Sequence, residues 1–223
     1  MQTWFFGLEN GYLHLKIGDA EKIYRHLEHV PPQLVLEPLP LGLPKALPEE
    51  RLKEIRSEVA QRLKADQEVR NDPARRGELA GVDAQNTRYL IELAQDVGWL
   101  DAKRFGLQTS ANAAILAQHS LNLPLVLAIL PLLERDFKVP GPEAEIFTVV
   151  YDGLQIDLGR KQRFGTQLAE DSNGEPMVLP LENIAKVEGY RKALGLPPLS
   201  EYLTTASKFL YDGKVIRMPR ADE

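Results

Sequence analysis

The sequence predicts a mainly α-helical, bundle-like domain with a small β-hairpin appendage at its N-terminus. Apolar residues recur at helical spacing through residues 49–71, which is typical of an amphipathic helix. Capping residues, glycines and prolines divide most of the later chain into further helical segments. Near the N-terminus, residues 3–17 alternate around Asn10-Gly11, a pair that favours a tight hairpin turn.

The N-terminal part is predicted as a hairpin, a short helix and an extended connector. Asp19 can cap a helix over residues 20–29, which Pro31-Pro32 would stop. Six prolines, interleaved with Leu and Val, fall within residues 31–48, so this stretch is neither a helix nor a central strand. We therefore expect an N-terminal region of residues 1–48, a main helical domain of 49–212 and a tail of 213–223.

The main domain begins with its clearest helix, Glu49–Asn71, which has an apolar stripe and ends before Asp72-Pro73. Asp83 and Ser110 are predicted to cap the next two helices, and Pro131 to kink the one that follows or to start a new one. The predicted helices after the first cover residues 84–97, 111–121, 123–137, 142–158, 183–194 and 200–209. Between them we expect an irregular loop over 159–167, a turn at Asn173-Gly174 and an extended piece over 177–181.

Composition excludes several functional classes. The 223 residues carry 27 Lys and Arg against 32 Asp and Glu, and a net charge of −5 argues against nucleic acid as a partner. The absence of Cys excludes disulfides, thiolate metal sites and a cysteine nucleophile. The longest apolar run, residues 123–133, is too short to cross a bilayer, and the N-terminus lacks the pattern of a secretory signal. We expect a cytoplasmic protein that has no membrane partner.

Three helices place polar side chains on the face that packing would fill with hydrocarbon. These residues are Asp66, Gln67 and Arg70 in the first helix, Asp83, Asn86 and Thr87 in the second, and Gln118 and His119 in the third. An unpaired buried polar group costs about 1–3 kcal/mol, so these groups should meet one another, the backbone or a ligand. The alternative is that each helix simply emerges into solvent at that end.

His119 is the candidate acid–base residue, because imidazole is the side chain that titrates nearest neutrality. Asp83 or Asp152 would orient it, and Asp152 is the weaker choice because its helical angle points away from the apolar stripe. The alternative for His119 is a hydrogen-bonded structural role. His26 and His29 share a helix face, but no third ligand is placed beside them, so we predict no metal and no cofactor.

The loop at residues 159–167 resembles an anion-binding loop without being a Walker motif. Its basic residues Arg160, Lys161 and Arg163 have the charge to contact a phosphate or carboxylate, and a solvated turn is the alternative. Gln162 and Gln167 flank Phe164-Gly165-Thr166.

One ordered set of short motifs carries a resemblance. It runs through Asp83-x-x-Asn86, Gly98-Trp99, Gln118-His119, Asp152, Gly159-x-x-Gln162-x-Phe164-Gly165-Thr166-Gln167, Arg191, Gly195-Leu196-Pro197-Pro198-Leu199 and Tyr202. Over roughly residues 51–203 the chain resembles a bacterial family of uncharacterised proteins, domain of unknown function 6624. Members usually show Asp-Arg at Asp152-Gly153 and Tyr at Phe164. The resemblance implies a shared helical fold, and its polar motif residues overlap the set obtained from helix geometry.

Two functions remain open. In the first, the chain is a small enzyme or binding domain with a polar pocket, in which His119 and Asp83 or Asp152 move a proton on a small anionic or peptide-like ligand. Arg70 and Arg191 would hold an anionic group. The residues expected to contact the ligand are Gln67, Arg70, Asn86, Gln118, Gln162, Thr166, Gln167 and Arg191. In the second, the chain is a noncatalytic interaction module whose polar residues fix helix register, and residues 1–48 dock a protein partner or a second copy.

Overall fold

The computed structural model describes residues 4–9, 12–17, 20–24, 37–120, 122–171 and 173–219. Its internal contacts divide the chain into two units, residues 1–36 and 37–223. The boundary that the sequence suggested at residue 48 therefore lies inside the larger unit.

The smaller unit contains a three-stranded antiparallel sheet in the order β1 (Trp4–Glu9), β2 (Tyr12–Ile17), β3 (Ala20–Tyr24). The helix predicted over residues 20–29 is wrong for its first part, which is β3, and residues 25–29 lie outside the described residues. Pairing of Ala20–Tyr24 along β2 satisfies backbone groups that a short isolated helix would satisfy poorly. His26 and His29 also lie outside the described residues.

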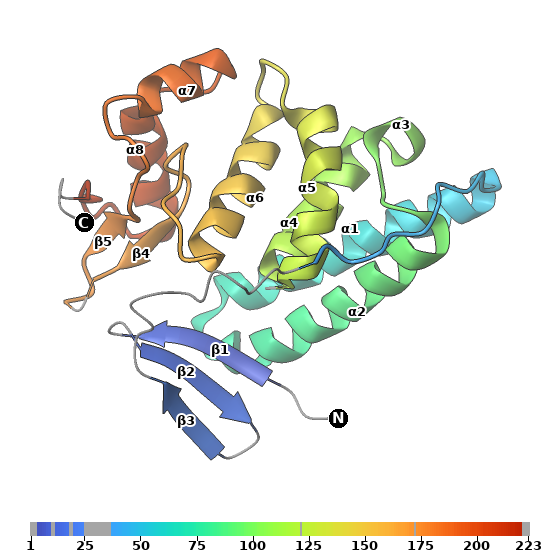
Figure 1. The fold of residues 1–223 in the computed structure, drawn as a ribbon, viewed down its shortest axis with the longest axis horizontal. Helices are drawn as coiled ribbons and strands as arrows, with labels where there is room; N and C mark the ends of the chain where they lie inside the picture. The colour runs from blue at the N-terminus through green and yellow to red at the C-terminus, as the bar shows by residue number, and fades with distance from the viewer. Residues whose placement is uncertain are drawn as a thin grey trace. The chain divides into compact units, whose positions relative to one another are not determined.

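The larger unit is mainly helical, as predicted (Figure 1). Its helices are α1 (Glu49–Asn71), the 3-10 helix η1 (Pro73–Glu78), α2 (Leu79–Val97), α3 (Ala102–Phe105), α4 (Leu107–His119), α5 (Leu123–Phe137), α6 (Ala144–Asp157), α7 (Val187–Ala193) and α8 (Leu199–Leu210). A two-stranded antiparallel hairpin, β4 (Leu168–Glu170) with β5 (Pro176–Val178), lies between α6 and α7. The sequence predicted one hairpin, in residues 3–17. β1 and β2 pair there as antiparallel strands, with β3 added to them, and the prediction did not include the second, two-stranded hairpin at residues 168–178.

Two helices begin several residues before the cap that the sequence predicted. Asp83 does not cap α2, because η1 leads directly into a helix that begins at Leu79. Ser110 does not cap α4, which begins at Leu107 after a turn at Gly106 with φ of 82°. The bounds of α1 and α5 agree with the prediction, and Pro131 lies inside α5.

α4 is the central helix of the larger unit, since it contacts α1, α2, α3, α5 and α6. Small residues make this possible: Ala113, Ala114 and Ala117 are fully buried and let the neighbouring helices approach closely. Leu116 and Ile55 of α1 join the same core. The packing fixes the C-terminal end of α4, and with it His119, against the end of α1 and the beginning of α2.

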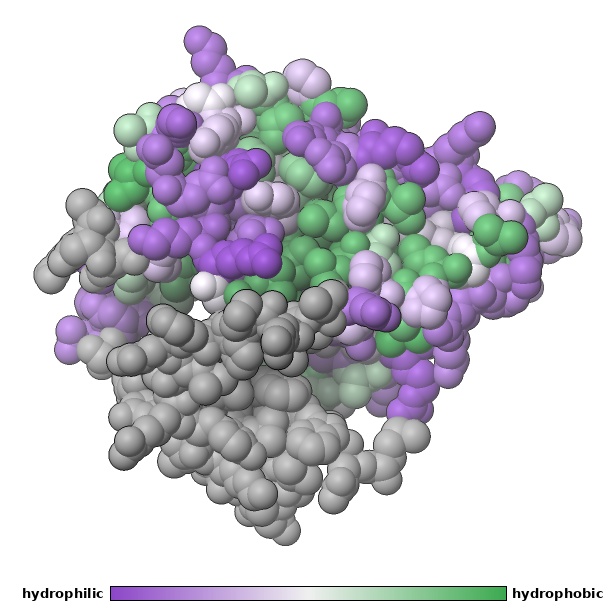
Figure 2. Space-filling view, in the orientation of Figure 1, coloured by the Kyte–Doolittle hydropathy of each residue, from purple (hydrophilic) through white to green (hydrophobic). Residues whose placement is uncertain are grey.

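Residues 37–48 lie along the helices of the larger unit. The backbone N–H groups of Leu39, Gly42 and Lys45 donate to the carbonyls of Pro124, Ala94 and Val97 at 2.8, 2.9 and 3.3 Å. In Figure 2, hydrophobic surface gathers over the middle of the larger unit, where this segment crosses the helices. The described part of the proline-rich segment, residues 37–48, is therefore docked on α2 and α5 by backbone hydrogen bonds, and we call it the strap.

The C-terminal part of the larger unit has a core of its own, formed by the β4–β5 hairpin, α7, α8 and Ile216. Arg217 extends the hairpin, because its backbone N–H and C=O bond with Pro176 and Val178 at 2.9 Å. None of the helices in the described residues is long and apolar enough to cross a membrane.

Candidate functional site

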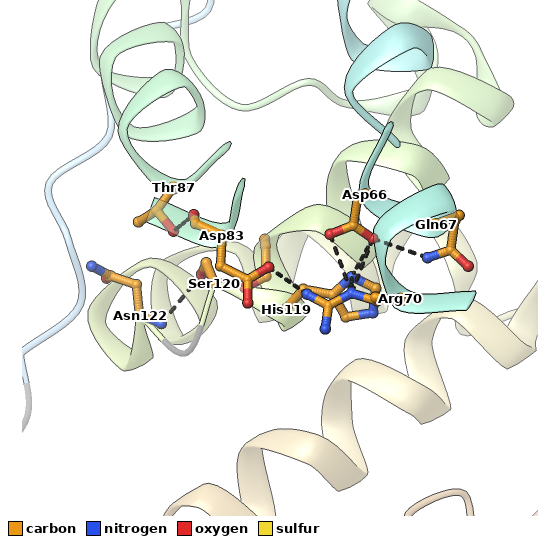
Figure 3. A network of polar contacts seen from close by, with 9 residues as sticks. Asp66, Gln67, Arg70, Asp83, Thr87, His119, Ser120 and Asn122 are labelled. Carbon is orange, nitrogen blue, oxygen red and sulfur yellow. Dashed lines mark hydrogen bonds and ion pairs between the residues drawn. The ribbon is translucent and has the colours of Figure 1, made fainter. Parts of the chain in front are cut away.

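Four charged or titratable side chains meet where the C-terminal ends of α1 and α4 lie against the first turns of α2 (Figure 3). Asp66 and Arg70 come from α1, Asp83 from α2 and His119 from the last turn of α4. The spacing of Asp66 and Arg70 is i,i+4, which places both on the face of α1 that packs on α4. We call Asp66, Arg70, Asp83 and His119 the acid–base cluster.

Asp66 is the centre of the cluster. Its side chain is 0% exposed, and its Oδ2 lies 2.9 Å from Nδ1 of His119. The Nε of Arg70 donates to both carboxylate oxygens, at 3.2 and 3.1 Å, and Nε2 of Gln67 donates to Oδ2 at 3.0 Å. A buried carboxylate needs such partners to remain ionised.

The contacts of Nδ1 define which tautomer of His119 the cluster favours. Nδ1 lies near both Oδ2 of Asp66 and Nε of Arg70, the latter at 3.1 Å. Because the Arg70 N–H already has both Asp66 oxygens as acceptors, the carboxylate is best matched by a proton on Nδ1. A neutral imidazole of this kind keeps Nε2 as an unprotonated acceptor, and within the described residues Nε2 has no hydrogen-bond partner.

Arg70 is shared by two carboxylates. While its Nε contacts Asp66, its Nη2 donates to Oδ1 of Asp83 across the α1–α2 interface. The side chains of Arg70, Asp83 and His119 are 26%, 23% and 19% exposed, so solvent reaches three members of the cluster. The backbone carbonyl of Asp83 accepts a hydrogen bond from the Thr87 hydroxyl, one turn later in α2, at 2.6 Å.

The environment moves the pKa values of the two carboxyl groups in opposite directions. Burial alone would raise the pKa of Asp66, but hydrogen bonds from His119 and Arg70, and their charges, bring it below the ordinary aspartate value. Burial raises the pKa of Asp83 and the nearby charge of Asp66 adds to the rise, which Arg70 and His119 only partly oppose. Two carboxyl groups with divergent pKa values beside an imidazole are typical of acid–base sites.

Gln118 and Asn86, two of the predicted ligand contacts, lie near the cluster without bonding to it. The Gln118 amide packs against Gly153 of α6, where a Cβ would meet its Nε2 at 3.3 Å. Asn86 is buried, its Oδ1 accepts from Arg62 at 3.4 Å, and its Nδ2 has no partner among the described residues. Arg62 also stacks on the Tyr89 ring at 4.0 Å.

Asp152, predicted as an alternative orienter of His119, belongs to a second network. It is fully buried on α6 and its carboxylate accepts from the backbone N–H of Arg163, Phe164 and Thr166 at 2.8–3.1 Å, and from the Thr166 hydroxyl at 3.0 Å. Burial raises the pKa of Asp152 despite these bonds. Its hydrogen bonds thus fix the 163–166 loop.

The remaining predicted residues complete this second network. Gln162 is fully buried and donates to the carbonyls of Gln167 and Leu179 at 2.9 and 2.8 Å, and Gln167 donates to the carbonyl of Val149 at 3.1 Å. Arg191 donates to the carbonyls of Pro197 and Phe164 at 2.7 and 2.8 Å. These hydrogen bonds go to backbone carbonyls of the chain itself.

The predicted site therefore divides into two. The structure brings Gln67, Arg70, Asp83 and His119 together, and it gathers Asp152, Gln162, Thr166, Gln167 and Arg191 separately around the loop that follows α6. Asp66 is the member that the candidate set lacked, although its place on the polar end of the α1 stripe was a signal for it. Among the described residues, no group of three or more His, Asp or Glu side chains is arranged to hold a metal ion.

Comparisons with known proteins agree with the motif pattern. A model for a family of unknown function, DUF6624, matches residues 49–215, which include all of α1 to α8. Searches of curated proteins and of solved structures gave no match. The match begins at the first residue of α1 and covers most of the sequence, so this chain belongs to the DUF6624 family.

Proposed function

We propose that the acid–base cluster is the proton-transfer site of a small enzyme, in which His119 accepts a proton at Nε2 and Asp66 orients the imidazole. The observation that carries the proposal is the 2.9 Å contact between the fully buried Asp66 carboxylate and Nδ1 of His119. An imidazole held at one nitrogen by a carboxylate, with its other nitrogen free for a reacting group, is the arrangement that general base catalysis uses. The substrate class expected from the sequence is a small anionic or peptide-like molecule.

The other members of the cluster have supporting roles in this proposal. Arg70 keeps Asp66 ionised and links it to Asp83. Asp83 is partly exposed and has a raised pKa, which suits a group that exchanges a proton with a bound molecule. Gln67 donates to Asp66, so it acts as a positioning residue.

The test is turnover of a panel of chromogenic esters, amides and phosphate esters by the full chain. His119→Asn and Asp66→Asn should each lower kcat/KM by at least about a hundredfold, the usual contribution of a general base. Glu92→Gln, which removes an exposed carboxylate elsewhere on α2, should leave it unchanged. If no substrate of the panel is turned over, or if His119→Asn retains full activity, the proposal is wrong.

A specific observation favours a second candidate, a noncatalytic module stabilised by polar networks. The Asp152 network bonds the 163–166 loop to α6 and α7 from within the chain, and such a network favours a unique fold. Self-association would then use the N-terminal unit. Because residues 37–48 bond to α2 and α5, the informative truncation removes residues 1–36 only. If sedimentation analysis shows that the truncated chain no longer forms dimers while its Tm is unchanged, this candidate is supported. If the truncated chain has the same oligomeric state as the full chain, this candidate is contradicted.

A further inference from the structure

The acid–base cluster has an unequal number of positive and negative groups. Asp66 and Asp83 both pair with Arg70, so two carboxylates share one guanidinium. Counting only the two carboxylates and the guanidinium, the cluster carries one negative charge in excess. Asp66 is fully buried, which leaves Asp83 as the carboxylate that a bound molecule can reach.

Arg70 is poorly placed to receive an anion. A guanidinium grips a carboxylate or phosphate through two parallel N–H groups, and the edge formed by Nε and Nη2 is the one that Arg70 uses here. Nε donates to Asp66 and Nη2 donates to Asp83, so an incoming anion could not use this edge without displacing a carboxylate already in place.

The next basic residue along this face does not supply the missing charge. Arg62 precedes Asp66 by one turn of α1, but it donates to Glu58 at 3.3 Å and to Asn86 at 3.4 Å and lies over the ring of Tyr89. Its charge is thus balanced by Glu58 and directed at α2.

Apart from Arg70, the partly exposed polar groups of the cluster and of the neighbouring Gln67 offer acceptors. Oδ2 of Asp83 and Nε2 of His119 have no partner within the described residues, and Gln67, which donates its Nε2 to Asp66, retains its carbonyl oxygen. A surface that offers acceptors and excess negative charge selects a ligand with N–H donors and positive charge.

We propose that the group received by this cluster is a primary amine or a guanidinium, bound by the Asp83 carboxylate with Nε2 of His119 as a second acceptor. This replaces the anionic ligand expected from the sequence and leaves the peptide-like one, since peptides carry such groups. The inference rests on the proposed function of the same site, and it concerns which molecule binds there.

The experiment is a titration of the full chain with agmatine, which carries both groups, followed through the imidazole ¹⁵N and ¹H signals of His119 at constant ionic strength. Inorganic phosphate and acetate are titrated in parallel. Agmatine should shift the His119 signals in a saturable way. Asp83→Asn should weaken its apparent affinity about tenfold, equivalent to ~1.4 kcal/mol.

Two further variants separate charge from folding. Asp83→Glu keeps the charge and should retain agmatine binding, while Glu92→Gln removes an exposed carboxylate of the same helix and should leave the affinity unchanged. The inference is overturned if phosphate or acetate saturates the His119 shifts while agmatine does not, if Asp83→Asn binds agmatine as the native chain does, or if no probe shifts His119. Anion binding together with His119-dependent turnover would contradict the cationic ligand and support the proton-transfer site. Agmatine binding without turnover would support the cationic ligand and contradict the proton-transfer site.

Discussion

Replacing Asp152 by Asn tests the division of the polar residues into two networks. The carboxylate accepts from three backbone N–H groups and one hydroxyl of the 163–166 loop. In the better orientation, the amide oxygen of Asn takes the place of Oδ2 and keeps the donors of Phe164 and Thr166. The amide NH2 group then faces the N–H of Arg163, which loses its acceptor.

The size of the effect follows from those contacts. One bond to a charged acceptor is lost, at about 1.5–3 kcal/mol, and three others weaken by about 1 kcal/mol each as the charge disappears. Burial raises the pKa of Asp152, so removing the charge offsets part of this loss. We expect the free energy of unfolding to fall by about 2–4 kcal/mol, a large share of the stability of a domain.

Urea denaturation followed by far-UV circular dichroism measures this change. Glu145→Gln, an exposed carboxylate in the first turn of the same helix, is the matched control and should cost less than about 1 kcal/mol. A loss below about 1 kcal/mol for Asp152→Asn would refute the structural role, since it would mean that the loop does not depend on the carboxylate.

Two further predictions concern the strap and the buried carboxylate. Gly42→Ala places a Cβ 2.1 Å from the carbonyl oxygen of Gln95, so it should lower the midpoint of urea unfolding by an amount equivalent to about 1–3 kcal/mol. Gly81→Ala, with no atom within 4 Å of the new Cβ inside α2, should instead stabilise by about 0.5–1 kcal/mol, and equal effects would contradict the docked strap. Because folding lowers the pKa of Asp66, its stabilisation is complete above its unfolded pKa of about 3.9 and is lost as the pH falls through the lower folded value. The stability difference between the native chain and Asp66→Asn, measured by denaturation from pH 5 to 2.5, should therefore shrink as the pH falls below about 4; a difference that grows in acid would show the opposite shift.

Strong local signals made the helices of the larger unit predictable. α1 agrees at both ends because an apolar stripe and Asp72-Pro73 define it. α2 and α4 begin earlier than predicted, since Asp83 and Ser110 have the side chains of caps but lie inside helices that earlier turns had already started. Nucleation upstream outweighed the capping preference.

Helical geometry also predicted which polar side chains turn inward, and Asp66 of α1 and Asn86 of α2 are buried as expected. Helical geometry gives no distance between the end of one helix and another. It therefore could not predict that Asp152 bonds to the 163–166 loop and not to His119. Nor could it decide which carboxylate faces His119. The packing of α1 on α4 places Asp66 against His119, while the Asp83 carboxylate, among the described residues, bonds to Arg70.

The strand β3 shows the limit of local patterns in the N-terminal unit. Residues 20–24 follow a good capping residue and have a helix-compatible sequence, yet they pair with β2. Pairing with an existing strand is a non-local interaction, and it outweighs a weak preference for a short helix.

The protonation of His119 in the free protein tests the central claim most directly. Long-range ¹H–¹⁵N NMR of imidazole-labelled protein, recorded at alkaline pH where the ring is neutral, distinguishes the two tautomers. The contacts predict a proton on Nδ1, donated to Asp66, with Nε2 unprotonated, and they predict that Asp66→Asn shifts the population toward the other tautomer. A native chain with its proton on Nε2, and Nδ1 accepting from Arg70, would contradict the account.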